Sequence, residues 1–306
     1  PGGGAMRAYR LGLYEKSMPN GLSLSEKLRL TRESGYDYLE LSVDETEEKL
    51  ARLAWDGVQL RAAVDAMEEA GVPIASLCLS GHRKYPLGHP DPAVAARSLD
   101  ILARAVDLAG GLGVRVIQLA GYDVYYEEST PQTRAQFGRS LRRCVELAAR
   151  AGVILAFETM ETPFLDTVEK AMAWVEQERS PYLQVYPDAG NLTNAALKYG
   201  GDVLDDLETG RGHLAALHLK EARPGAYREV PYGQGCVDFA AVAGKGLELG
   251  VRMFVAEFWH TGRDTWRDDL AGNCRYLRRF LDQSPAAVFS LSKKRHQQSE
   301  NNGGIV

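Results

Sequence analysis

Short apolar runs alternate with longer amphipathic segments along most of this chain, and this alternation limits its fold more than any other feature. Eight runs have the length and composition of strands, and each precedes a segment with helical periodicity. Such alternation is typical of a parallel sheet with crossover helices. The expected strands are 10–14, 38–42, 74–79, 114–120, 153–158, 183–186, 215–219 and 253–257. The expected helices are 23–34, 57–70, 92–112, 131–151, 167–178, 194–209, 239–249 and 266–282.

Glycines recur at the joints between helices and strands. Five of them follow an expected helix and precede the next strand by one to three residues, where a helix C-cap needs positive φ. Eight strand–helix units in about 270 residues fit a single-domain (β/α)₈ TIM barrel. A doubly wound sheet is the alternative fold, but the first turn (LYEKSMPNG) lacks the phosphate-binding G-x-G-x-x-G pattern. The five glycines are Gly35, Gly71, Gly113, Gly152 and Gly250.

The two ends of the chain differ from this pattern. Residues 1–6 are Gly-rich and are expected to be a disordered leader or a cloning remnant, and residues 285–306 become polar and are expected to form a disordered tail. The barrel domain is therefore expected over residues 7–284.

Charge, hydropathy and cysteine spacing exclude several classes of partner. A net charge of -5 gives no basic field for nucleic acid or an anionic membrane. No run approaches the length of a membrane span, and the start has no signal-peptide core. The four cysteines are far apart, without C-x-x-C pairs, as in a reduced cytoplasmic protein. We expect a cytoplasmic protein that acts on a small molecule.

Four expected strands end in a polar residue that can bind metal. Active sites of TIM barrels lie at the C-terminal ends of the strands, and consecutive strands are neighbours. Single strand-end acids are usually salt bridges or helix caps, but three acids together would repel one another without a cation. Three carboxylates and one imidazole suit one divalent ion, Mn²⁺, Mg²⁺, Co²⁺ or Zn²⁺. The predicted ligands are Glu158, Asp188, His218 and Glu257.

Several sequence blocks resemble one known family. The segments GLYEKSMP, LELSVDET, LCLSGHRKYPLG, VIQLAGYDVYYEE, YPDAGNL, HLKEARPG and VPYGQGCVDF are similar to the L-ribulose-5-phosphate (L-xylulose-5-phosphate) 3-epimerases of the xylose-isomerase-like TIM barrels. The resemblance covers residues 11–281. It implies a homodimer, a metal bound by the four strand-end residues, and a proton-transfer pair formed by Glu158 and Glu257.

The chemistry of C3 epimerisation agrees with that implication. A weakly acidic proton next to the C2 carbonyl must leave one face of C3, and a proton must return to the other face. A divalent metal stabilises the enediolate, and two carboxylates on opposite sides exchange protons with C3. Glu158 and Glu257, three strands apart around the barrel, are the expected catalytic residues.

The residues around the site favour a phosphorylated substrate. Asn191 stands where the free-ketose epimerases of this superfamily have a histidine, and the phosphate-using branch has asparagine there. Arginine and lysine at the rim suit a phosphate dianion. The candidates for substrate or phosphate binding are Lys16, His82, Arg83, Lys84, Asn191 and Lys220; Tyr14, Glu15, Gln118, Tyr125 and Tyr126 are further candidates for hydroxyl recognition.

The expected function is interconversion of L-ribulose 5-phosphate and L-xylulose 5-phosphate in pentose or L-ascorbate breakdown. Alternatives are another sugar isomerase or epimerase, an inosose-type dehydratase that expels water from the same enediolate, and a non-catalytic sugar-binding barrel. Phosphodiester cleavage like that of endonuclease IV is disfavoured, because that chemistry uses a histidine-rich three-metal cluster and this chain has six histidines.

Overall fold

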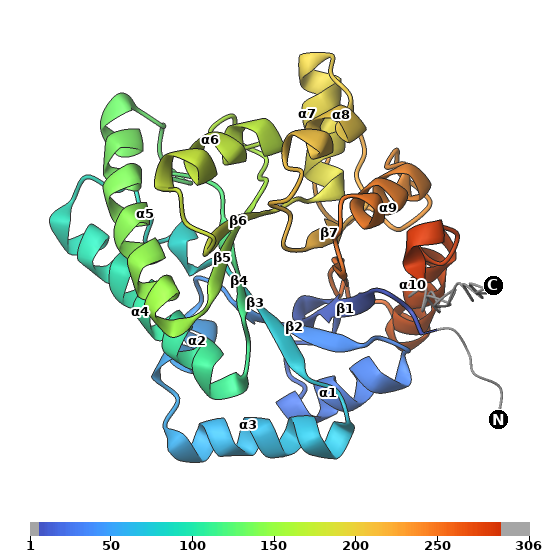
Figure 1. The fold of residues 1–306 in the computed structure, drawn as a ribbon. Helices are drawn as coiled ribbons and strands as arrows, with labels where there is room; N and C mark the ends of the chain where they lie inside the picture. The colour runs from blue at the N-terminus through green and yellow to red at the C-terminus, as the bar shows by residue number, and fades with distance from the viewer. Residues whose placement is uncertain (1–5, 289–306) are drawn as a thin grey trace, which may run out of the picture.

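Eight parallel strands form one sheet that curls into a barrel in the computed structural model, which describes residues 6–288 (Figure 1). The sheet order is β6-β5-β4-β3-β2-β1-β8-β7. The parallel bridges Val185–Leu214 and Asp188–His218 close the gap between β6 and β7. The expected TIM barrel is therefore confirmed. The strands are β1 (Arg10–Tyr14), β2 (Tyr38–Val43), β3 (Ile74–Leu79), β4 (Val116–Ala120), β5 (Ile154–Glu158), β6 (Leu183–Tyr186), β7 (Leu217–Leu219) and β8 (Met253–Ala256).

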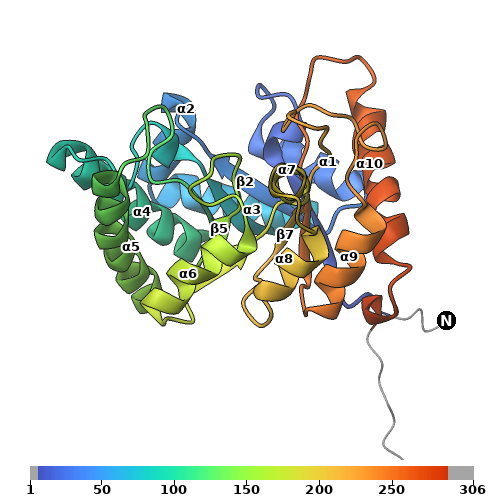
Figure 2. The same ribbon diagram turned by 90° about the horizontal axis from the view of Figure 1, so that it is seen from above.

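Helices surround the barrel and cover its outer surface (Figures 1 and 2). The five glycines expected at the joints all have positive φ, between 66° and 92°. The α-helices are α1 (Leu24–Glu33), α2 (Glu47–Leu50), α3 (Gly57–Ala70), α4 (Pro92–Leu112), α5 (Pro131–Ala151), α6 (Val168–Glu178), α7 (Ala189–Tyr199), α8 (Val203–Thr209), α9 (Phe239–Glu248) and α10 (Trp266–Leu281). The 3-10 helices are η1 (Glu15–Ser17), η2 (Ala51–Ala54), η3 (Gly81–Arg83) and η4 (Pro285–Ala287).

The helix expected over residues 194–209 is wrong in both its start and its continuity. The segment forms two helices, α7 and α8, and α7 begins at Ala189. Asp188 caps α7 by accepting a hydrogen bond from Asn191 N at 2.8 Å. Gly200 ends α7 with φ 66°, a conformation that stops the helix. The early start matters for the site, because it places Asp188 at a helix N-terminus directly after β6.

The core has two layers. Between sheet and helices lies a large apolar layer that includes Leu11, Phe157 and Phe254. Inside the barrel lies a smaller cluster in which the Tyr38 ring packs so closely over Gly12 that an added Cβ would clash with it. The filled interior makes the barrel a rigid frame that fixes the directions of the side chains at the ends of its strands.

The ordered chain extends beyond the expected domain end at residue 284. Pro285–Ala287 form η4, and Ala8 N donates a hydrogen bond to Ala287 O at 2.7 Å. The antiparallel bridge between Arg7 and Val288 ties the two ends together. The expectations for residues 1–5 and 289–306 lie outside the described residues.

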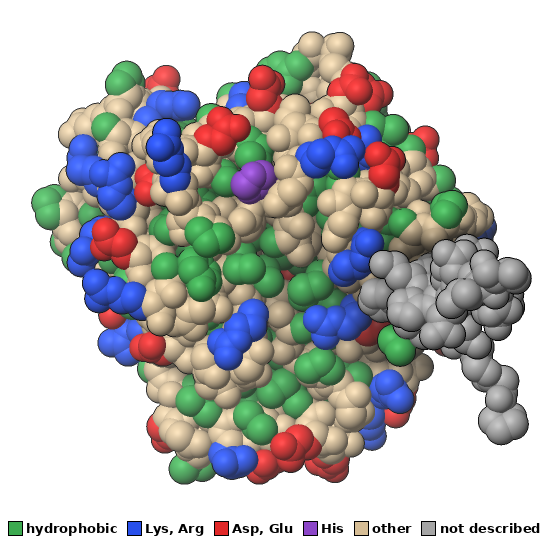
Figure 3. Space-filling model, viewed as in Figure 1, with side chains coloured by type: hydrophobic (Ala, Val, Ile, Leu, Met, Phe, Trp, Pro, Cys, Tyr) green, Lys and Arg blue, Asp and Glu red, His purple; other side chains and the backbone are tan. Residues whose placement is uncertain are grey.

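The molecular surface carries charges of both signs (Figure 3). Acidic and basic side chains are interspersed on the face shown in Figure 3, without a continuous basic area. No helix within residues 6–288 is long and apolar enough to cross a membrane. The four cysteines are all free thiols, as their spacing predicted: Cys78, Cys144, Cys236 and Cys274.

Candidate metal and active site

The four predicted ligands come together at the C-terminal end of the barrel. Glu158 ends β5, Asp188 follows β6, His218 lies in β7 and Glu257 follows β8. Because β5 and β6 pair, and β7 and β8 pair, these residues stand on one side of the barrel rim. One ligand atom of each lies within 4.8 Å of those of the other three.

The three carboxylates converge on one nitrogen of His218. Its Nδ1 lies 3.0 Å from Glu158 Oε1, 2.9 Å from Glu257 Oε2 and 3.8 Å from Asp188 Oδ2. All four side chains are buried. Buried carboxylates this close repel one another, so a cation between them would be strongly favoured.

Two carboxylate oxygens in the cluster lack a directed hydrogen bond. They are Asp188 Oδ2 and Glu257 Oε2, and both are buried. Lys220 Nζ lies 3.2 Å from Asp188 Oδ2 and offers charge compensation without a well-aligned bond. Oxygen and imidazole donors with free lone pairs fit a divalent ion that keeps open positions for substrate oxygens. The cluster could therefore hold one metal ion.

Burial and charge shift the protonation of this cluster strongly. Burial raises the pKa of Asp188 to about 7, the neighbouring Glu257 adds to that rise, and Lys220 opposes it. Burial alone would lower the pKa of Lys220, but Asp188 and Glu257 outweigh it and raise that pKa above its ordinary value. Lys220 therefore stays charged beside the cluster.

A residue that the sequence did not suggest holds the other side of His218. Glu40 of β2 is fully buried, and its Oε1 lies 2.6 Å from His218 Nε2. Its Oε2 accepts hydrogen bonds from Ser76 Oγ at 2.7 Å and Tyr186 OH at 2.5 Å. A carboxylate at Nε2 keeps the proton there and leaves Nδ1 free to bind metal. The signal was an acid inside an apolar strand, YLELSV.

Replacing Glu40 with glutamine should weaken metal binding by about 10- to 100-fold, because His218 loses the carboxylate that orients its ring. Titration calorimetry with Mn²⁺ measures this directly, without reference to catalysis. The control is Glu33→Gln on the exposed face of α1, which should leave the affinity unchanged. Equal Mn²⁺ affinity in the Glu40 variant and the control would contradict this role.

A cavity of about 190 Å³ opens directly onto the cluster. Glu158 and Glu257 line it, and Tyr14 and Trp259 form an aromatic wall with ring centroids 5.9 Å apart. Four residues predicted to contact substrate also line it: Lys16, Arg83, Asn191 and Lys220. The cavity therefore joins the proposed proton-transfer pair to most of the predicted binding residues.

Three of these lining residues already have polar partners. Lys16 forms an ion pair with Asp44, and Lys220 Nζ donates to Asn191 Oδ1 at 2.8 Å. Asn191 Nδ2 donates to Thr159 O at 2.8 Å, which fixes the amide. Asn191 and Lys220 thus form a rigid polar wall beside Asp188.

Two predicted phosphate ligands do not line the cavity. His82 is buried against α4, with Nε2 2.9 Å from Ser98 O, and burial lowers its pKa to about 4, so it is neutral. Lys84 is exposed and lies 3.8 Å from Glu47. Both side chains follow β3, but the turn of η3 directs only Arg83 into the cavity.

The further candidates for hydroxyl recognition have mixed positions. Tyr14 lines the cavity, whereas Glu15 is fully buried among Lys27, Lys49 and Arg52 and does not. The expectation for Glu15 is wrong, because three cations draw its carboxylate away from the cavity. The others bind acidic side chains: Gln118 donates to Glu158, Tyr125 to Glu161 and Tyr126 to Glu45.

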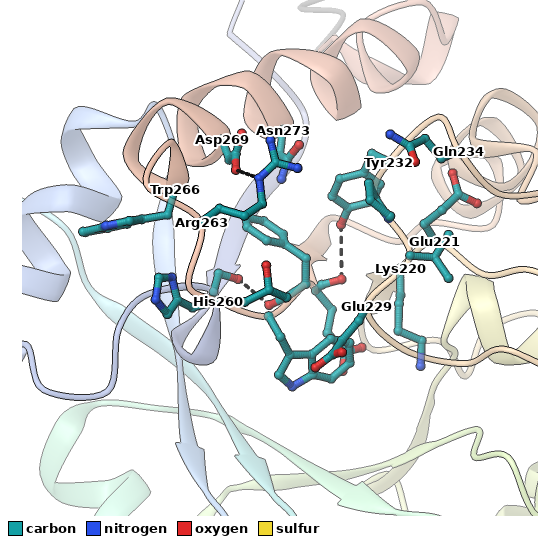
Figure 4. A pocket seen from close by; sticks show the side chains of 17 residues that line it. Lys220, Glu221, Glu229, Tyr232, Gln234, His260, Arg263, Trp266, Asp269 and Asn273 are labelled. Atoms are coloured by element: carbon teal, nitrogen blue, oxygen red, sulfur yellow. Dashed lines mark hydrogen bonds and ion pairs between the residues drawn. The ribbon is translucent and has the colours of Figure 1, made fainter.

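A second cavity, of about 280 Å³, adjoins the first (Figure 4). Tyr232 lines one side, and Arg263, which pairs with Asp269 at 3.3 Å, lines the other. This cavity reaches Glu257 but not Glu158. A substrate that must meet both glutamates therefore belongs in the first cavity. The two cavities share Lys220, Glu257 and Trp259.

A TIM barrel with acids and a histidine at the ends of its strands defines a class of metal-binding barrels, and comparison with known proteins places the chain in a family of TIM barrels. The family described as "Xylose isomerase-like TIM barrel" matches residues 28–280, and the chain belongs to it. L-ribulose-5-phosphate 3-epimerase UlaE of Escherichia coli (strain SE11) is 46% identical over 229 residues, which are 75% of this chain and 79% of the relative. The chain is therefore an enzyme of the L-ribulose-5-phosphate 3-epimerase family.

Solved structures with the same fold include two sugar epimerases. D-psicose 3-epimerase from Clostridium cellulolyticum H10 superimposes with a TM-score of 0.74 at 14% identity, covering 89% of this chain and 99% of that one. An L-ribulose 3-epimerase superimposes with a TM-score of 0.69 at 19% identity, covering 90% and 95%. At such identities the likeness shows the fold.

Proposed function

We propose that this enzyme interconverts L-ribulose 5-phosphate and L-xylulose 5-phosphate by inverting C3. The observation that carries the proposal is the convergence of Glu158 and Glu257 on His218 Nδ1, at 3.0 and 2.9 Å, beside a cavity that both glutamates line. The substrate follows from the relatives, which are named L-ribulose-5-phosphate 3-epimerase and are 46% identical. The same reaction fits breakdown of pentoses or of L-ascorbate.

The two glutamates perform the proton transfer. One carboxylate removes the C3 proton, the electron pair left on C3 delocalises onto the C2 carbonyl as an enediolate, and the other carboxylate returns a proton to the opposite face. The reaction is reversible, so the two residues exchange roles with the direction. A divalent metal held by Glu158, Asp188, His218 and Glu257 would supply Lewis-acid stabilisation of the charge that develops on the substrate oxygens.

The surrounding residues position the substrate and exclude water. Lys220 and Asn191 present a fixed charge and a fixed amide to the substrate hydroxyls. Tyr14 and Trp259 cover the sugar with apolar surface. A fixed polar wall costs little reorganisation during the reaction, which favours the charged transition state.

The test is proton exchange in deuterated water. The purified enzyme with Mn²⁺ or Mg²⁺ should convert L-ribulose 5-phosphate to L-xylulose 5-phosphate and place deuterium at C3, as read by NMR. Absence of exchange with every divalent metal would refute the proposal. Loss of water from the substrate would instead indicate a dehydratase, which needs the same first proton transfer.

Binding of metal should also stabilise the folded chain. Mn²⁺ at 100 times its dissociation constant should raise the free energy of unfolding by about 2.7 kcal/mol over protein treated with a chelator. The stabilisation should disappear in a variant with Asp188→Ala, which removes a ligand but leaves the proton-transfer pair in place. Equal stability with and without Mn²⁺ would contradict metal binding at this cluster.

A further inference from the structure

Gln118 is a polar residue inside an otherwise apolar strand, β4, whose sequence is VIQLA. Its side chain is fully buried. Val116 belongs to the cluster inside the barrel and Ala120 lines the substrate cavity, so the alternation of side chains along the strand directs Gln118 into the barrel as well. Gln118 is not among the residues that line the cavity, and it therefore lies below the cavity rather than in its wall.

The amide of Gln118 contacts one of the two glutamates of the proton-transfer pair. β4 and β5 pair in parallel, with Gln118 beside Ala156 and Ala120 beside Glu158. The two alanines leave room for the longer side chain, and Gln118 Nε2 donates a hydrogen bond to Glu158 Oε2. The other carboxylate oxygen, Oε1, lies 3.0 Å from His218 Nδ1. Both oxygens of Glu158 are therefore held, one beside the histidine and the other by an amide.

The second oxygen-bearing end of this amide has no such partner. Gln118 Oε1 is buried and finds no hydrogen-bond partner within residues 6–288. A buried acceptor without a partner destabilises a fold, and an apolar side chain of similar length would not have one. Turning the amide over would bring its oxygen against the Glu158 carboxylate, which has no proton to donate when it is ionised. The bond to Glu158, rather than the stability of the barrel, therefore explains a glutamine at this position.

The other glutamate of the pair has no matching amide. Glu257 Oε2 lies 2.9 Å from His218 Nδ1, but it is buried without a directed hydrogen bond. Tyr232 OH lies 3.4 Å from the main-chain oxygen of Glu257, so this contact holds the backbone and not the carboxylate. The two glutamates are thus equally close to His218 and differ in how their carboxylates are fixed.

We propose that Gln118 is a positioning residue for Glu158, whose carboxylate it holds at the angle that proton exchange with one face of C3 requires. It acts through Glu158 and does not touch the substrate. The inference rests on the proposed function, because it takes both glutamates to be proton carriers. Proton transfer needs the carboxylate oxygen within hydrogen-bond reach of C3 and correctly directed. Loss of the amide should therefore slow transfer on the face of C3 that Glu158 serves and spare the face that Glu257 serves.

The experiment follows exchange of the C3 proton with deuterated water at saturating Mn²⁺, separately for L-ribulose 5-phosphate and L-xylulose 5-phosphate. Early exchange into the starting epimer reports the one glutamate that serves its face, whereas net epimerisation needs both. The variant Glu158→Gln identifies the epimer that Glu158 serves, because exchange into that epimer is lost.

The expected result for Gln118→Met is a selective loss. Exchange into the epimer that Glu158 serves should fall by about 10- to 100-fold, as when a group that orients an active-site ligand is removed. Exchange into the other epimer should stay within about twofold of wild type, since its proton moves through Glu257. Net epimerisation should fall by the same factor in both directions, because both directions pass through the slowed step.

Measurements of binding and folding separate this role from damage to the barrel. The urea midpoint of metal-free Gln118→Met should be no lower than that of wild type, because the variant lacks the unpaired oxygen. Calorimetry should show that the variant still binds Mn²⁺. The matched control is Gln184→Met on β6, where the amide contacts Pro181 O at 2.9 Å and His213 Nδ1 at 3.0 Å, and it should keep exchange into both epimers.

A second variant, Gln118→Leu, should reproduce the selective loss with a different apolar side chain. An equal fall for both epimers, or no fall for either, would overturn the role of Gln118 and leave the epimerase proposal intact. A wild-type enzyme that exchanges neither epimer would instead refute the epimerase proposal, and this inference with it.

Discussion

Replacing either Glu158 or Glu257 with glutamine should slow C3 epimerisation by about 10²- to 10⁴-fold, because glutamine cannot take up or return a proton. Both side chains are buried and both contact His218 Nδ1, so the substitution preserves shape while removing the titratable group. Rates measured with L-ribulose 5-phosphate and with L-xylulose 5-phosphate test this. Any deuterium exchange that survives in one variant should be confined to one epimer, since the remaining carboxylate reaches one face of C3.

A matched control separates this loss from a general effect of removing an acid. Glu146 lies on the surface of α5 and pairs with Arg143 at 2.9 Å. The variant Glu146→Gln should therefore keep wild-type rates. Mn²⁺ titration of both active-site variants shows whether metal is still bound. A variant that binds Mn²⁺ and keeps a rate within tenfold of wild type would rule out that glutamate as a proton carrier.

The sequence predicted the barrel well because its signals are local. Strand composition and helical periodicity arise from neighbouring residues, and β1, β3, α3, α4 and α5 have the expected bounds. The error at residues 194–209 has a physical cause. Ala189, Gly190 and Asn191 follow a strand and include poor helix formers, so they look like a loop. The cap that Asp188 supplies overrides that preference.

The metal cluster was predictable because each ligand ends a strand, and barrel geometry brings strand ends together. The residues that surround and orient the cluster were not predictable from the sequence. Glu40 lies within a strand, and its partners Ser76 and His218 are 36 and 178 residues away. Arg228, which also lines the cavity, stands in the loop between β7 and α9, where no helical or strand periodicity distinguishes it from other surface arginines. Interactions between distant loops and strands depend on the folded chain, so sequence patterns do not reveal them.

Replacing Glu15 with alanine should destabilise the fold by about 3–5 kcal/mol. Glu15 depends on interactions with residues that are distant in the sequence. Its carboxylate accepts hydrogen bonds from Lys27 Nζ at 2.9 Å, Lys49 Nζ at 3.1 Å and two nitrogens of Arg52 at 2.6 Å. These partners come from α1, α2 and η2, and Glu15 itself is fully buried. Removing it leaves three cations close together with no anion. Urea unfolding at neutral pH measures the change.

The pH dependence of Glu15→Gln tests the same cluster independently. Burial acts to raise the pKa of Glu15, but Arg52, Lys27 and Lys49 outweigh it and hold that pKa well below its ordinary value. A carboxyl with a lowered folded-state pKa contributes stability above its unfolded pKa, about 4.3, and loses it as the pH falls below that. The gap in unfolding free energy between wild type and Glu15→Gln should therefore shrink below about pH 4.

The matched control for Glu15→Ala is Glu33→Ala, which breaks an exposed pair with Arg29 and should cost under about 1 kcal/mol. A cost for Glu15→Ala as small as that control, or a gap independent of pH, would show that the buried cluster does not stabilise the fold.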